Sequence, residues 1–209
     1  MLKITTWGES HGGTVGVVID GVPPRLNITQ QDIQRDLDRR KPGQSSIVSP
    51  RRESDEASIT SGLQSNVTLG TPLTILVANK DARPKDYEKI SMAYRPSHAD
   101  YTYDQKYQIL AQSGGGRSSA RETVGRVAAG AVAKCILRHF LNAEVVGYVV
   151  EVGGIRAENI DTHKVTESMV ESNVVRCPDA EKAKEMEARI KDIRKEGDSV
   201  GGVVECVVR

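Results

Sequence analysis

The sequence predicts a mixed α+β fold, and three features support this prediction. Short segments rich in β-branched residues recur along the chain, a helix-forming segment runs from Ser119 to about Phe140, and an amphipathic segment follows Pro178. The chain has 209 residues, the size of one large or two small domains. Because no linker clearly divides the sequence, we expect residues 1–209 to form a single domain.

The N-terminal part is expected to form two strands and a helix. Leu2–Thr6 and Thr14–Asp20 are β-branched segments that predict strands, joined by the loop WGESHGG. Thr29, with Asp32 three residues later, is typical of a helix N-cap. Pro42 ends this helix, because a proline cannot continue it.

The middle of the chain is expected to contain two strands, a long loop and the long helix. Ala57–Leu63 and Pro72–Asn79 predict the strands. The polar segment Lys80–Gln112 contains two prolines, and we expect a loop with little secondary structure, of the kind that is either functional or disordered. Ser119 and Glu122 have the spacing of a capping box, so we expect the long helix to begin at Ser119.

The C-terminal part is expected to form a strand, a helix and a second strand. Val145–Val152 predicts the first strand. Pro178 and Asp179 begin a charged amphipathic helix that ends near Gly197. The apolar face of this helix consists of Ala183, Met186, Ile190 and Ile193. The last residues, GGVVECVVR, predict a strand at the end of the sequence.

The composition argues against several classes of protein. The chain has 29 basic and 28 acidic residues, so its charge does not favour binding to nucleic acid or to a membrane surface. No segment has the roughly 20 uninterrupted apolar residues that span a bilayer. Cys135, Cys177 and Cys206 are far apart and lack metal-ligand spacing, so we expect reduced thiols and no metal site.

The segment SGGGRSSARE, residues 113–122, is the strongest candidate for a binding site. A glycine-rich turn precedes a capped helix start that carries Arg117, Ser118, Ser119 and Arg121. Backbone N–H groups at a helix start favour anions, and guanidinium groups bind phosphate or carboxylate with two hydrogen bonds. The spacing is that of neither a Walker loop nor a Rossmann fingerprint. The alternative is a simple turn with solvated arginines, but the complete cluster favours an anion site.

Three further segments add positive or titratable side chains. His11 lies in GESHG, Arg95 and His98 lie in YRPSHAD, and Arg39 and Arg40 lie in DRRKPGQS. Each segment is weak evidence alone, because a single histidine is usually structural and the two arginines can interact with the C-terminus of their own helix. Together, they predict a small, multiply charged anionic substrate and one or two histidines that transfer protons.

These segments together resemble the chorismate synthase family. GESHGGTVGVVIDGVP and GGGRSSARETVGRVAAGAVAK are similar to two family signatures. DRRKPGQS, GTPLTILVANKDARPKDY, YRPSHADYTYDQKY and EGDSVGGVVECVV follow the order of the family. The resemblance covers nearly the whole chain, and this combination of motifs is highly specific.

The resemblance implies a fold, an activity and cofactors. The family fold is a β-α-β sandwich, with central helices between antiparallel-rich sheets, and it assembles as a homotetramer. The family converts 5-enolpyruvylshikimate 3-phosphate to chorismate by an anti 1,4-elimination of phosphate. This reaction needs reduced FMN, which NADPH reduces in some members. We therefore expect a small phosphorylated substrate and no nucleic-acid or membrane partner, in the cytoplasm or in a plastid.

The resemblance also implies roles for individual residues. His11 matches the histidine that protonates the departing phosphate, and His98 matches a histidine near the reduced flavin. The residues that match flavin-binding positions are Arg95, Arg117, Ser118 and Ser119. Those that match anion-binding positions, for the substrate or for NADPH, are Arg40 and Arg121.

The sequence also departs from the family pattern. Trp7 stands where the family commonly has Phe, and Lys41 where an Arg is usual. Ser46 stands where many members carry an Arg or Lys, and the segment KYQIL replaces the usual KYGIR. The usual opening residues are missing, and family chains extend well beyond this C-terminus, where the aspartate that removes the C–H proton lies. We therefore expect an incomplete domain that does not complete the reaction alone.

Two rival functions from other classes remain open at this stage. One is a non-catalytic module that binds a phosphorylated metabolite or an RNA backbone. The near-zero net charge, and the lack of aromatic residues among the basic ones, disfavour RNA. The other is a phosphatase or lyase that does not need flavin.

Overall fold

The computed structural model describes residues 1–48, 53–80, 93–109 and 115–209. The chain divides into two compact units. The N-terminal unit comprises residues 1–42 and 51–136, and the C-terminal unit comprises residues 43–50 and 137–209. The mixture of helices and sheets confirms the predicted α+β class.

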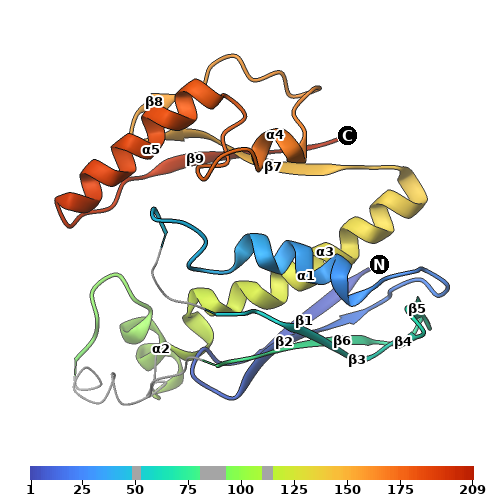
Figure 1. The fold of residues 1–209 in the computed structure, drawn as a ribbon. Helices are drawn as coiled ribbons and strands as arrows, with labels where there is room; N and C mark the ends of the chain where they lie inside the picture. Colours follow the sequence, from blue (N-terminus) through green and yellow to red (C-terminus); the bar gives the residue numbers. More distant parts are fainter. Residues whose placement is uncertain (49–52, 81–92, 110–114) are drawn as a thin grey trace. The chain divides into compact units, whose positions relative to one another are not determined.

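The N-terminal unit contains a four-stranded antiparallel sheet with the order β1-β2-β6-β3 (Figure 1). Its strands are β1 (Lys3–Gly8), β2 (Thr14–Asp20), β3 (Ala57–Ser61) and β6 (Leu73–Ala78). All four correspond to predicted strands. The strand predicted to reach Leu63 ends at Ser61, because Gly62 adopts a φ of +86° that turns the chain. A short hairpin of β4 (Leu63–Gln64) and β5 (Val67–Thr68) follows.

Helix α1 (Gln30–Arg40) begins with the predicted cap. The Oγ1 atom of Thr29 accepts a hydrogen bond from the Asp32 backbone N–H at 3.2 Å, and an Asp32 carboxylate oxygen accepts one from the Thr29 N–H at 2.8 Å. Ile33 and Leu37 are fully buried on the face that meets the sheet. The helix stops at Arg40, two residues before Pro42.

Helix α3 (Thr123–Leu141) begins later than the prediction. Two single 3₁₀ turns, Gly116–Ser118 and Ala120–Glu122, precede it. Ser119 lies between these turns in an extended conformation, so regular α-helical hydrogen bonds cannot pass through it. Its hydroxyl accepts a hydrogen bond from the Arg121 N–H at 3.3 Å and thus caps the second 3₁₀ turn instead of α3.

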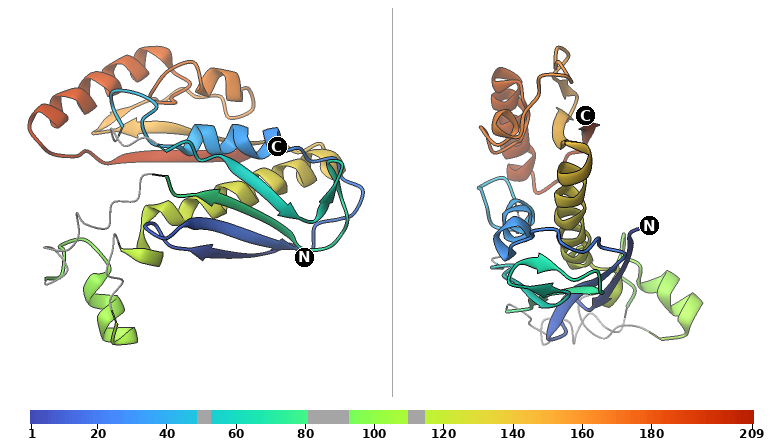
Figure 2. Two further views of the ribbon diagram at one scale, coloured as in Figure 1. Left: turned by 60° about the horizontal axis from the view of Figure 1, so that its bottom comes forward. Right: turned by 90° about the vertical axis from the view of Figure 1, so that its right-hand side faces the viewer.

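Helices α1 and α3 cover one face of this sheet (Figures 1 and 2). Val17 of β2, Ile75 of β6 and Val132 of α3 are each at most 1% exposed in the shared core. At Gly125 of α3, an added Cβ would lie 2.9 Å from the Thr6 methyl carbon. The glycine therefore lets α3 lie directly against the strands that hold the β1–β2 loop.

The C-terminal unit has an antiparallel sheet with the order β8-β7-β9. Its strands are β7 (Val145–Val152), β8 (Ile155–Arg156) and β9 (Gly202–Val208), and its helices are α4 (Glu167–Val170) and α5 (Ala180–Lys195). Helix α5 begins where the sequence predicted a helix start, directly after Pro178 and Asp179, and Asp179 is its N-cap. The apolar face of the helix packs in the core of this unit. Tyr148 of β7 is buried and donates a hydrogen bond to Glu205 of β9 at 2.6 Å. Burial, together with this contact, raises the pKa of Tyr148 to about 12.

The polar segment Lys80–Gln112 contains a helix that the sequence did not predict, α2 (Asp100–Tyr107). No residue of α2 is buried, so it lacks the apolar periodicity that reveals a helix in a sequence. The remainder of the prediction for this segment falls partly on residues 81–92 and 110–112, outside the described residues. All three cysteines are free thiols, as expected. Among the described helices, none is long and apolar enough to cross a bilayer.

Candidate functional site

The loop between β1 and β2 carries His11 next to two glycines. Its ring atom Nδ1 lies 2.9 Å from the hydroxyl of Ser10, and Ser10 is only 3% exposed. The Gly12 N–H donates a hydrogen bond to the Glu9 carbonyl at 3.1 Å and closes a tight turn around the histidine. The buried serine thus orients an imidazole that remains partly exposed.

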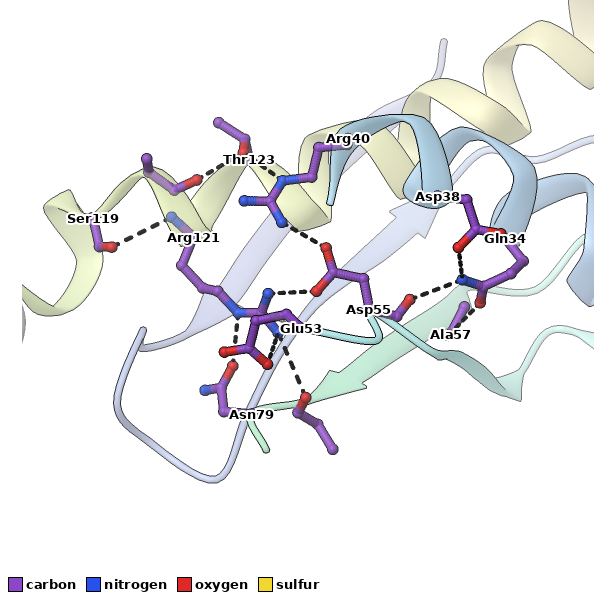
Figure 3. Close-up of polar contacts among 12 residues, drawn as sticks. Gln34, Asp38, Arg40, Glu53, Asp55, Ala57, Asn79, Ser119, Arg121 and Thr123 are labelled. Atoms are coloured by element: carbon purple, nitrogen blue, oxygen red, sulfur yellow. Dashed lines mark hydrogen bonds and ion pairs between the residues drawn. The ribbon is translucent and has the colours of Figure 1, made fainter. Parts of the chain in front are cut away.

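Two arginines from distant parts of the chain meet at Asp55 (Figure 3). One carboxylate oxygen of Asp55 accepts a hydrogen bond from Arg40 at 2.6 Å, and the other accepts one from Arg121 at 2.5 Å. The side chain of Asp55 is fully buried, while those of Arg121 and Arg40 are 5% and 19% exposed. Asp55 therefore brings the end of α1 next to the turn that precedes α3.

A second carboxylate balances the charge of this cluster. Glu53 lies 3.8 Å from the Arg121 guanidinium, and its side chain is 3% exposed. Two buried or half-buried arginines would be costly without such partners, because charges lose their hydration inside a protein. Arg40 also donates to the Thr123 hydroxyl at 3.2 Å, and 19% of its side chain remains exposed.

The turn at Gly115 is attached to the end of β1 through Arg117. Gly115 has a φ of +81°, a conformation that favours glycine. The Arg117 guanidinium donates to the carbonyls of Gly8 at 2.7 Å and Thr6 at 3.0 Å. It also forms an ion pair with Glu122, which accepts a further hydrogen bond from the Thr6 hydroxyl. Arg117 therefore joins the glycine turn to the strand that leads into the His11 loop.

The two serines of this turn differ in their contacts. The exposed Ser118 donates a hydrogen bond from its hydroxyl to the Gly115 carbonyl at 2.6 Å. Ser119 accepts from the Arg121 N–H, so its own hydroxyl proton can be donated elsewhere. Both serines belong to the segment, residues 113–122, for which the sequence predicted an anion-binding site.

Arg95 and His98 lie in a third segment, just before α2. Arg95 makes a two-pronged ion pair with Asp100, with both N–O distances at 2.7 Å. These hydrogen bonds lower the pKa of Asp100 to about 2. A Cβ built on Gly115 would lie 3.6 Å from the Arg95 guanidinium, so Arg95 lies beside the glycine turn. His98 is exposed, and its Nδ1 donates to the Pro96 carbonyl at 2.9 Å.

The structure thus brings together most of the predicted residues of the N-terminal unit. Arg40 and Arg121 share Asp55, Arg117 lies at the entry to the His11 loop, and Arg95 lies beside Gly115. In the described part of the chain, the contacts of His98 relate it to its own segment and not to His11. No group of three or more potential metal ligands occurs among the described residues.

The comparison with known protein families decides the assignment. The family model described as chorismate synthase matches residues 2–209. The chain belongs to the chorismate synthase family. It is 58% identical to a chorismate synthase of Trichormus variabilis, 57% to one of Synechocystis and 59% to one of Microcystis aeruginosa. Each comparison covers the whole of this chain, which spans 57–58% of the length of these relatives.

A solved structure supports the same assignment. A protein entitled "Crystal Structure of Chorismate Synthase" superimposes with a TM-score of 0.74 and 28% sequence identity. The superposition covers 99% of this chain and 57% of that protein. The fold of this chain is therefore of the chorismate synthase type.

Sequence reasoning missed four residues of this site: Glu53, Asp55, Asn79 and Glu122 were not identified as contacts of the arginines. Glu122 was interpreted only as part of a capping box, and Asn79 only as the end of a strand. One signal was available, because several clustered arginines on a chain with almost no net charge need carboxylates nearby. Sequence alone does not say which carboxylates they are.

Proposed function

We propose that this chain forms part of a chorismate synthase active site, which eliminates phosphate from 5-enolpyruvylshikimate 3-phosphate to give chorismate. The observation that carries the proposal is the convergence of Arg40, Arg121 and the His11 loop within one unit. Arginines suit a substrate with a phosphate and two carboxylates, because their planar donors match these anions. The family membership and the matching motifs support the choice of substrate.

In this proposal, Arg40 contacts a substrate anion directly. Its guanidinium is oriented by Asp55 and Thr123, and 19% of its side chain is exposed. Arg121 is almost fully buried, so its main effect is to hold Asp55 in place and thereby to orient Arg40. This arrangement fixes the donor before the substrate arrives, which lowers the entropic cost of binding.

His11 donates a proton to the departing phosphate oxygen. A neutral or monoanionic phosphate is a better leaving group, and an imidazole can supply the proton near neutral pH. Because the Ser10 hydroxyl contacts Nδ1, we propose the other ring nitrogen, Nε2, as the atom that donates the proton. A proton lost from another substrate carbon then balances the elimination.

The glycine turn has groups that fit FMN. The Ser119 hydroxyl and the Arg95 guanidinium lie beside a glycine with positive φ, and such donors suit the polar edge of a flavin or its phosphate. The Ser118 hydroxyl, whose proton goes to the Gly115 carbonyl, can accept a hydrogen bond there. We propose that Arg95, Ser118 and Ser119 contact the cofactor, and that Arg117 contributes by holding their turn against β1. Reduced FMN supplies the electron-rich ring that assists phosphate loss. His98 would lie near this ring and accept or donate a proton there.

We extend the proposal to assembly, reductant and location on the family resemblance. The full-length protein would form a homotetramer, use FMN that NADPH can reduce, and work in the cytoplasm, as the cyanobacterial sources of the relatives suggest. Light scattering during size-exclusion chromatography tests the tetramer. Oxidation of NADPH at 340 nm in the presence of FMN tests the reductant.

The central experiment is an anaerobic titration with reduced FMN and substrate, with chorismate followed by its absorbance. It compares the 209-residue chain with an extended chain that carries the C-terminal segment of the Trichormus variabilis relative. We expect turnover from the extended chain, and His11→Ala should lower its kcat about 100-fold or more, with KM changed much less. His163→Ala is the matched control, because His163 is exposed in the C-terminal unit. Flavin binding without chorismate formation by the extended chain would favour the binding-module alternative.

A further inference from the structure

Asn79, directly after β6, connects the arginine cluster to the His11 loop. Its side-chain NH₂ group donates hydrogen bonds to the carbonyls of Glu9 at 2.8 Å and Gly12 at 2.7 Å. Its side-chain oxygen accepts a hydrogen bond from Nε of Arg121 at 2.9 Å (Figure 3). Its backbone N–H donates to the Gly13 carbonyl at 3.0 Å.

The amide side chain is suited to this position because it carries donors and an acceptor at one end. The two loop carbonyls require donors, whereas the Arg121 guanidinium requires an acceptor. A carboxylate would satisfy only the arginine, and a hydroxyl is too short to reach three partners. Asn79 is thus matched to both of its neighbours.

The loop needs such an anchor because its own sequence leaves it flexible. Gly12 and Gly13 follow His11, and glycine loses more conformational freedom on folding than other residues. The pairing of β1 with β2 ends at Gly8 and Val15, and that of β2 with β6 begins at Thr14, so residues 9–13 have no partner in the described strand ladders. The three hydrogen bonds from Asn79 reach both ends of this unpaired stretch.

We propose that Asn79 is a positioning residue that holds the His11 loop in a fixed place relative to Arg121. This inference rests on the proposed function, in which His11 transfers a proton to an anion bound near the arginines. A shift of the loop would move the imidazole away from the leaving group while Arg40 still bound the substrate. Loss of Asn79 should therefore lower kcat more than it changes KM.

Two variants separate the contacts of Asn79. Asn79→Ala removes all three side-chain hydrogen bonds. Asn79→Asp keeps an acceptor for Arg121 but places a charged oxygen against the carbonyls of Glu9 and Gly12. Gln34→Ala is the matched control, because its amide also links two backbone groups, those of Asp55 and Ala57, without a contact to the His11 loop.

The first measurement is amide hydrogen exchange by NMR on the 209-residue chain, which needs no activity. We expect the Gly12 amide to exchange about tenfold faster in Asn79→Ala and in Asn79→Asp, since the loop loses its anchors. In the control, the Ala57 amide should exchange faster while that of Gly12 stays unchanged. Unchanged Gly12 exchange in both Asn79 variants would overturn the proposal. If Asn79→Ala does not fold, Asn79→Ser, which keeps one donor, replaces it.

The second measurement is turnover of the extended chain, normalised to folded protein. Both Asn79 variants should lower kcat about tenfold or more and change KM less than about threefold, whereas Gln34→Ala should change neither to this degree. A residue that only stabilises the fold would reduce the amount of folded protein without this effect on kcat, and such a result would overturn the positioning role. If the unmutated extended chain makes no chorismate, the proposed function fails, while the exchange data still test the anchor.

Discussion

Replacement of Asp55 by asparagine tests the buried cluster most directly. The two side chains have the same shape, and asparagine tolerates the φ of +46° at this position, so the change removes charge without backbone strain. An asparagine oxygen can accept from one arginine, but its NH₂ group then faces the other. Among the described residues, Arg121, at 5% exposure, would then keep one carboxylate in ion-pair range, that of Glu53 at 3.8 Å.

The expected loss of stability follows from these contacts. Removal of one member of a buried ion pair costs about 3–5 kcal/mol, because the remaining charge is buried without compensation. Glu53 offsets part of this cost, and Arg40 can turn toward water, so we expect a loss of about 3 kcal/mol for Asp55→Asn. Domains are stable by about 5–15 kcal/mol, so most of the protein should remain folded in water.

The assay is urea unfolding followed by tryptophan fluorescence. Trp7 is the single tryptophan of the chain, and it lies in β1 of the N-terminal unit, so its signal reports on the unit that contains Asp55. The control is Asp38→Asn, whose carboxylate is 43% exposed and pairs with Lys41 at the surface. It should cost at most about 1 kcal/mol. If Asp55→Asn costs no more than this control, the cluster does not stabilise the fold as we argue.

Three further predictions concern packing and pH. Gly125→Ala should destabilise the protein by about 1–3 kcal/mol, because its new methyl group would meet β1. Gly130→Ala in the same helix should stabilise the protein by about 0.5–1 kcal/mol, because its methyl group meets nothing within 4 Å. Thermal unfolding of both variants checks these values. Burial raises the pKa of Tyr148 to about 12. The protonated tyrosine therefore stabilises the folded state below about pH 10, and this contribution is lost as the pH rises toward 12. Tyr148→Phe should remove this alkaline dependence of the urea midpoint. Arg95 lowers the pKa of Asp100 from 3.8 to about 2. The stabilisation from this ion pair, present above pH 3.8, should therefore disappear as the pH falls toward 2. An NMR titration that gives an ordinary pKa for the Asp100 carboxyl would contradict this prediction.

The sequence alone was sufficient for most of the secondary structure. β-branched segments predicted strands β1, β2, β3, β6, β7 and β9. The cap at Thr29 predicted the start of α1, and the Pro178-Asp179 pair predicted the start of α5. These signals are local, because caps and alternation depend on residues a few positions apart. The motifs likewise sufficed to identify the family, which the match of the chorismate synthase family model to residues 2–209 confirms.

The tertiary structure decided how the arginines are used. From the sequence, Arg117 and Arg121 were expected at a helix start, available to an anion. In the structure, Arg117 holds the end of β1, and Arg121 is buried between Asp55 and Asn79. The α-helix itself starts only at Thr123.

The physical reason is that a guanidinium satisfies its charge with whichever carboxylate the fold brings near, however distant that carboxylate is in sequence. Asp55 is 66 residues from Arg121, and Asn79 is 67 residues from Gly12. No local pattern records such pairs. The sequence by itself therefore determined the elements, the family and the residues that carry charge, whereas only the packed sheet and helices decided which of those charges meet and how the His11 loop is held.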